Sequence, residues 1–111
     1  MRPVSVAATP TAATLTTVYT VPTGYYALFN LMYLHNTTGS TKSITAQWYD
    51  SSAATSYDIL SSYSMSSKEY LKFDGGAYIV LEEGDQFRVT TETGSTFSVL
   101  GTFELFGAQR T

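Results

Sequence analysis

Cysteine is absent from this 111-residue chain and histidine occurs only once. Without cysteine the chain can form no disulfide, no thiolate zinc site and no thiol nucleophile. With His35 alone, a catalytic triad or a multi-histidine metal site would need other residue types in its remaining places. We therefore predict no enzymatic activity, no cofactor and no required metal, and we interpret His35 as a polar residue at a strand end.

Charged residues are also scarce, with six Lys and Arg against nine Asp and Glu, for a net charge of −3. The basic residues are scattered singly, so the sequence has no basic patch for binding phosphates, and nucleic acid is not an expected partner. No apolar run approaches the ~20 residues of a membrane span, and Pro3 and Pro10 interrupt any signal-peptide pattern. The expectation is a protein that does not cross or bind a membrane.

The chain is rich in residues that favour pleated sheets. Aromatic residues make up 14%, and Ser and Thr together number 31 against 15 charged residues. Thr, Tyr, Phe and Val favour strands, and few Lys and Glu remain for solvated helix faces. Because 111 residues suffice for a single core, we predict one all-β domain, a β-sandwich or jelly-roll-like fold of about eight antiparallel strands.

Turn residues divide the chain into segments of alternating hydrophobicity. The expected strands are residues 14–21, 24–34, 43–49, 57–65, 69–73, 77–81, 86–91 and 96–106. The polar stretch 35–40 is predicted to be a hairpin loop and 82–85 a tight turn between paired strands. Residues 1–13 lack bulk and are expected to form an extended N-terminal arm that orders against a neighbour, and 107–111 to form a short tail.

The segment 24–34 is apolar on both faces when read at a period of two. One predicted face carries Ala27, Phe29, Leu31 and Tyr33, and the other carries Tyr26, Leu28, Met32 and Leu34, with Asn30 interrupting the second set. A strand of this kind lies inside a sheet with the core on one side and a second layer or subunit on the other. By strand phase the predicted core is Leu15, Phe29, Leu31, Ile44, Trp48, Ile59, Leu71, Phe73, Ile79, Phe87, Val89, Phe97, Val99 and Phe103.

Two binding sites remain as alternatives. The carboxylates of Asp74, Glu82, Glu83 and Asp85 could surround a calcium ion, although their spacing lacks an alternating-ligand pattern and such residues are common in turns. The side chains of Trp48, Tyr49, Tyr57 and Tyr63 could form a platform for sugar rings, but the phase of Trp48 favours a core position.

Two motifs mark the turns of the predicted sandwich. The first is Val18-Tyr19-Thr20-Val21-Pro22-Thr23-Gly24, followed by an apolar strand that ends near Asn36-Thr37-Thr38-Gly39, and the second is Gly75 to Val89, with Val80-Leu81-Glu82-Glu83-Gly84-Asp85 at its turn. Both motifs resemble those of small virion proteins of tailed bacteriophages. The resemblance spans residues 14–106. It implies a β-sandwich that decorates or cements the head by binding the lattice of the major capsid protein, as a homo-oligomer, commonly a trimer.

The same resemblance leaves other places open, namely a tail, neck or fibre-associated structural protein, and the composition also suits a carbohydrate-binding module. It implies a location on the outer surface of the capsid after synthesis in the host cytoplasm. Residues predicted to bind partners are Val4, Val6, Tyr26, Leu28, Met32, Leu34, Leu100 and Phe106.

Overall fold

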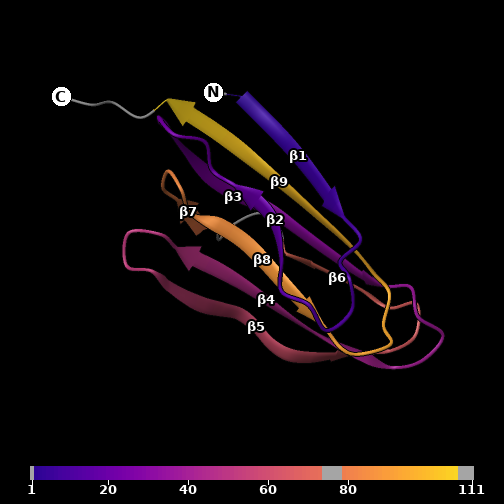
Figure 1. Cartoon of the computed structure of the whole chain (residues 1–111). Helices are drawn as coiled ribbons and strands as arrows, with labels where there is room; N and C mark the ends of the chain where they lie inside the picture. Colours follow the sequence, from indigo (N-terminus) through magenta and orange to yellow (C-terminus); the bar gives the residue numbers. More distant parts are fainter. Residues whose placement is uncertain (1, 74–78, 108–111) are drawn as a thin grey trace.

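The computed structural model describes residues 2–73 and 79–107, which form two antiparallel β-sheets packed face to face (Figure 1). The strands of this described part are β1 (Arg2–Ala8), β2 (Thr16–Thr20), β3 (Tyr25–Asn36), β4 (Lys42–Asp50), β5 (Thr55–Met65), β6 (Tyr70–Phe73), β7 (Ile79–Leu81), β8 (Gln86–Thr91) and β9 (Phe97–Gly107). The all-β prediction is confirmed, and the ends of the predicted strands agree with these bounds to within two residues, except that the predicted start at residue 77 lies outside the described residues. Within the described ranges there is no helix long and apolar enough to cross a bilayer.

The strand pairs are those of a long hairpin, in which the first half of the chain runs antiparallel to the second half. β1 pairs with β9, β2 with β8, β3 with both β6 and β7, and β4 with β5. This folded ribbon is rolled so that β9 also pairs with β3, and β8 with β4. Sheet A therefore has the order β1-β9-β3-β6, with β7 also on β3, and sheet B has the order β2-β8-β4-β5. Two rolled Greek keys of this kind make a jelly roll, in which β6 and β7 act as one interrupted strand.

Most loops of the jelly roll pass from one sheet to the other. β3 lies in sheet A and β4 in sheet B, and the same is true of β7 and β8. The predicted hairpins at 35–40 and 82–85 are therefore wrong, because these loops arch between the layers. A short polar loop can join neighbouring strands or span the ~10 Å between two sheets, and its own residues do not distinguish the two.

A β-bulge in β3 reverses the facing of the second half of the strand. Its pairing with β9 shifts register between Phe29 and Leu31, so that Asn30 is the extra residue. The apolar residues of β3 buried between the sheets are Ala27, Phe29, Met32 and Leu34. The predicted grouping of Leu31 with Phe29 is wrong, because alternation changes phase at a bulge.

The N-terminal segment is an edge strand of sheet A and does not extend away as an arm. β1 pairs with β9 without a register shift, from Arg2 opposite Leu105 to Ala8 opposite Val99. The prediction of an arm that orders only against a neighbour is corrected here. Its small side chains do not prevent a backbone ladder, since each residue brings its own donor and acceptor except at proline.

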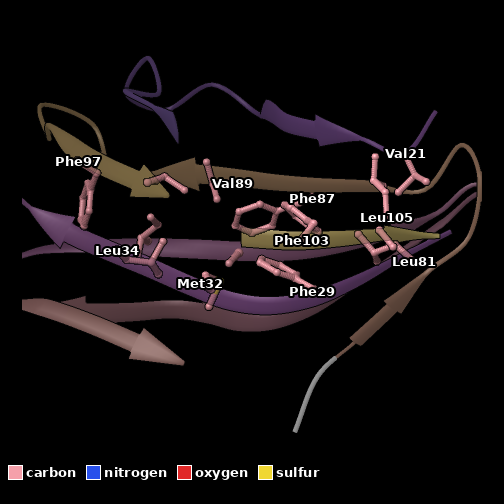
Figure 2. Close-up of a cluster of buried hydrophobic side chains, with 14 of the residues drawn as sticks. Val21, Phe29, Met32, Leu34, Leu81, Phe87, Val89, Phe97, Phe103 and Leu105 are labelled. Carbon is pink, nitrogen blue, oxygen red and sulfur yellow. The ribbon is translucent and has the colours of Figure 1, made fainter. Parts of the chain in front are cut away.

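The core lies between the sheets and centres on phenylalanine rings (Figure 2). The Phe29 ring lies 4.4 Å from that of Phe103 and 4.7 Å from that of Phe87, measured between centroids. A Cβ atom at Gly101 would lie 3.1 Å from Cε1 of Phe103, so glycine at that position lets the rings approach the backbone of β9. This close approach of side chains to the backbone explains why a glycine occurs inside the strand.

The predicted core is confirmed in its centre and wrong at two positions. Its fully buried members are Phe29, Ile44, Phe87, Val89, Phe97, Val99 and Phe103. Half-buried against them lie Trp48, Ile59, Leu71 and Ile79. Leu15 is 51% exposed, because it precedes the edge strand β2, and Leu31 faces outward because of the bulge. The side chain of Phe73 lies outside the described part.

Asn36 holds the loops at the end of the sandwich where β3 finishes. The residue is fully buried, and its Nδ2 lies within 3.1 Å of the carbonyl oxygens of Ser40, Met65 and Ser66. Its Oδ1 accepts a hydrogen bond from the backbone N of Thr38 at 3.0 Å. The Asn36 amide thereby joins the loop after β3 to the segment after β5, which explains why a polar residue occupies a buried position.

Candidate functional site

The outer face of sheet A gathers apolar side chains from four strands. In the register of the sheet its apolar members are Tyr26, Leu28, Leu31 and Tyr33 on β3, Leu100 and Phe106 on β9, Tyr70 on β6 and Val80 on β7. Three of them are clearly exposed to solvent, with exposed fractions of 39% for Leu100, 44% for Val80 and 60% for Tyr70. Contiguous exposed apolar residues of this kind mark interaction surfaces, in contrast to single exposed residues.

Aromatic pairs stiffen this outer face. The rings of Tyr26 and Phe106 stack at 5.2 Å, and those of Tyr33 and Tyr70 at 5.5 Å, between centroids. A shallow groove over β1, β9 and β3 is lined by Ser5, Val6, Leu31, Tyr33, Leu100, Gly101 and Thr102. Stacked rings on a sheet present area without much loss of side-chain freedom on binding, which suits a docking surface.

The outer face of sheet B has a different chemistry. The Arg88 guanidinium lies 3.8 Å from the centroid of the Tyr49 ring, and its Nε donates to Gln86 at 2.6 Å. The Nε2 of Gln47 donates to Asp58 at 2.9 Å. These polar groups are paired with one another across the face. The two outer faces therefore separate into one apolar and one polar surface.

Half of the residues predicted to bind partners lie on the outer face of sheet A, namely Tyr26, Leu28, Leu100 and Phe106. Met32 and Leu34 do not, because the bulge turns them into the core, where they are 3% and 0% exposed. Val4 and Val6 face inward on β1 and are half-buried against the core. The assignment of Met32 and Leu34 to a partner surface is corrected accordingly, while that of Val4 and Val6 stays a prediction, since both are half-buried and Val6 also lines the groove.

Four members of the outer face were missed by the strand phase, namely Leu31, Tyr33, Tyr70 and Val80. The sequence does contain a signal for the first two, since Asn30 is a polar residue inside an otherwise apolar run and marks the bulge. For Tyr70 and Val80 the signal is the partner strand, because they lie beside His35 and Leu28 only through pairing.

Two of the acidic residues considered for calcium, Glu83 and Asp85, make structural hydrogen bonds. Asp85 is 1% exposed; its Oδ1 accepts from the backbone N of Ser51 at 3.0 Å and from the hydroxyl of Ser51 at 3.2 Å. Its Oδ2 accepts from the indole Nε1 of Trp48 at 3.1 Å and the backbone N of Glu82 at 3.0 Å. Asp74 lies outside the described residues, and no group of three possible metal ligands occurs within them.

The sequence motifs at 18–24 and 79–89 meet at the end of the sandwich that holds Asp85. The backbone N of Gly84 donates to the carbonyl of Val21 at 3.0 Å, and the N of Val21 donates to the carbonyl of Asp85 at 3.0 Å. The N of Gly24 donates to Oε2 of Glu83 at 2.6 Å. Gly24 and Gly84 have φ of +86° and +85°, a region that favours glycine. The motifs are therefore two halves of one structural contact.

The proposed sugar platform does not form from its four aromatic residues. Trp48 faces the core and Tyr49 the outer face of sheet B, because neighbours in a strand point to opposite sides. Tyr57 lies against Trp48 with a centroid distance of 5.5 Å. The core position favoured for Trp48 is therefore correct in facing, with the side chain only half-buried.

His35 lies on the outer face of sheet A near the end of β3. Its Nε2 is 3.2 Å from the carbonyl oxygen of Lys68, and it stands opposite Tyr70 on β6. A ring nitrogen bonded to a loop carbonyl fits the interpretation of a polar residue at a strand end.

The pKa of the Glu92 carboxyl group is lowered from its usual value. The hydrogen bond from the backbone N of Ser43, helped by the Ser43 hydroxyl and the charge of Lys42 3.6 Å away, holds the pKa of the Glu92 carboxyl below its usual value although desolvation acts to raise it. The group connects the loop after β8 to the start of β4, so its role is structural.

Comparisons of the chain with protein-family models, with curated protein sequences and with solved structures found no match.

Proposed function

We propose that the chain is a non-catalytic structural protein of a virus particle, a decoration or cement protein that binds the lattice of the major capsid protein as a homo-oligomer. The observation that carries the proposal is the contrast between the outer faces of the two sheets. Sheet A presents Leu100, Val80 and Tyr70 at 39%, 44% and 60% exposure, while sheet B presents internally paired polar groups. When another protein covers the apolar outer face of a sheet, apolar surface is removed from water and the free energy falls.

The use of the polar side chains also supports a structural role. The carboxylate of Asp85 and the amide of Asn36, both buried, are used in hydrogen bonds that hold loops. Glu92 is likewise bonded to the start of β4. Side chains committed to holding the backbone suit a static component of an assembly, whereas catalysis uses polar groups that face a substrate.

The motifs at residues 18–24 and 75–89 are the reason for proposing a virus particle in preference to another kind of assembly. They resemble head-surface and tail proteins of tailed bacteriophages, and the structure supplies a reason for their spacing, since the two turns bond to each other through Val21, Gly84 and Asp85.

The test is the presence of the chain in purified particles. Particles banded on a density gradient from the cultures that make this chain are analysed by mass spectrometry, and the ratio of the chain to the major shell protein is measured. We expect a fixed ratio, loss of the chain on mild denaturant treatment, and recovery of that ratio when purified chain is added back. A chain found only in the soluble fraction, or binding of the purified chain to a glycan array in place of particles, would contradict the proposal.

A further inference from the structure

We propose that the outer face of sheet A is the contact between copies of this chain, so that two copies pack with these faces together. The inference rests on the proposed function, because it names the partner of the same apolar face. Two observations support it, the apolar side chains of β3, β9, β6 and β7 and the pairing of β1 with β9. The segment 2–8 was expected to reach a neighbour, but it is paired within sheet A and so does not cover this face.

The area of the face suits a pair of copies. β3 and β9 have 12 and 11 residues, β1 has 7, and β6 and β7 together have 7. At about 3.3 Å per residue and about 4.8 Å between strands, the face covers about 600 Å² in each copy, or about 1,200 Å² in a pair. Stable specific interfaces begin at about this size.

The charge on the face permits self-association. Among the described side chains, its register places one basic residue, Lys72, opposite Tyr33 at one edge, and one acidic residue, Glu104, opposite Leu28 toward the other edge. A face with one charge of each sign meets its own copy without net repulsion, whereas a uniform charge would oppose a like partner.

The shape of the face is also suited to its own copy. The shallow groove is lined by Leu31, Tyr33 and Leu100, of which Tyr33 stacks on Tyr70, and the stacked pair Tyr26–Phe106 lies further along β3 and β9. Leu100 is 39% exposed and projects from the middle of the sheet, beside Tyr33, so it is the side chain best placed to be covered by a second copy. Aromatic and aliphatic side chains of this kind form the centre of homodimer interfaces.

The consequence is an assembly of four layers, in which both A sheets are inside and both B sheets are outside. The polar face with Arg88 and Gln47 then faces water, and the loop ends held by Asn36 and Asp85 remain accessible for the capsid lattice.

The experiment measures the oligomeric state of the purified full chain by sedimentation equilibrium over micromolar to millimolar concentrations. Leu100→Glu places a carboxylate in the centre of the contact, and Thr17→Glu is the matched control, because it adds the same charge at an exposed position on the outer face of sheet B. We expect the wild type and Thr17→Glu to form oligomers and Leu100→Glu to be a monomer. Circular dichroism checks that each variant is folded.

A second variant keeps the test decisive if Leu100→Glu does not fold. Leu100→Thr retains strand propensity but removes apolar area from both sides of the contact, and should raise the dissociation constant by about tenfold. A monomeric wild type overturns the proposal, as does a folded Leu100→Glu variant that associates as well as the wild type, or equal dissociation by Thr17→Glu.

These results are separable from those for the proposed function. A monomer in solution that still binds particles, and loses that binding with Leu100→Glu, would assign the face to the capsid lattice and overturn only the self-contact. An oligomer that is absent from particles would overturn the proposed function and leave the self-contact standing.

Discussion

Replacing Asp85 by asparagine should destabilise the fold strongly although the side chain hardly changes size. The buried carboxylate accepts hydrogen bonds from Trp48 Nε1, the backbone N of Glu82, and the backbone N and hydroxyl of Ser51. An amide can orient its NH₂ group only toward one of the two oxygen positions. The least harmful choice is toward Ser51, whose hydroxyl can turn to accept, but the backbone N–H of Ser51 then loses its acceptor.

The magnitude follows from these contacts. A buried donor left without an acceptor costs about 1–3 kcal/mol, and hydrogen bonds to a charged group are each stronger than neutral ones by about 1 kcal/mol. The lower desolvation cost of a neutral amide offsets part of this loss. We expect a net reduction of about 3 kcal/mol in the free energy of unfolding, which corresponds to a melting temperature lower by roughly 10–20 °C for a domain of this size.

The assay is urea unfolding followed in parallel by circular dichroism and tryptophan fluorescence. Trp48 is the only tryptophan in the sequence and donates directly to Asp85, so its emission reports the altered contact. Asp58→Asn is the matched control, because it removes the same charge from an exposed residue bonded to Gln47. This control should change stability by less than about 0.5 kcal/mol.

The reasoning is refuted if Asp85→Asn unfolds at the same urea concentration as Asp58→Asn with an unchanged slope. An equal loss in both variants would mean that net charge decides stability here, and that the hydrogen bonds at Asp85 contribute little.

Three further substitutions test other parts of the fold. Asn36→Asp sets a carboxylate oxygen against three backbone carbonyls and should lower the free energy of unfolding by about 3 kcal/mol; a neutral effect in urea unfolding would exclude that network. Thr91→Val removes a buried hydroxyl that has no hydrogen-bond partner among the described residues, and should raise stability by about 1 kcal/mol in the same assay, whereas a loss would mean the hydroxyl is bonded. Glu92→Gln tests the contact with Ser43 through pH: the carboxyl pKa is lowered in the folded state, so its contribution is full above the ordinary pKa and is lost as pH falls through the folded pKa. The difference in melting temperature between wild type and Glu92→Gln should therefore vanish on acidification, and a difference that is independent of pH would contradict this.

The sequence by itself determined the strands and many of the core residues. Alternation around Phe87 and Val89, or around Phe97 and Val99, is a local property of a half-buried strand, and turn residues such as Gly24 and Gly84 require backbone conformations that few other residues adopt. Such signals can be read without knowledge of any partner strand.

The candidate surface was only half predictable from the sequence. Tyr26 and Leu28 lie before the bulge and Leu100 and Phe106 on a regular strand, so strand phase assigned their facing correctly. Beyond Asn30 the phase is reversed, and Met32 exchanges its place with Leu31. A bulge costs little within a ladder, and its position depends on the partner strand β9 as much as on β3.

Only the tertiary structure decided how the strands pair and what covers each face. Arg2–Ala8 joined β9 through backbone hydrogen bonds, which are the same for nearly every residue and carry little sequence information. Loop 37–41 crosses between the sheets because β3 already has β9 on one side and β6 and β7 on the other, and loop 82–85 crosses because β8 lies between β2 and β4 in sheet B. The outer face of sheet A exists as a surface only after Leu100, Tyr70 and Val80, which are distant in the chain, are brought beside β3 by that pairing.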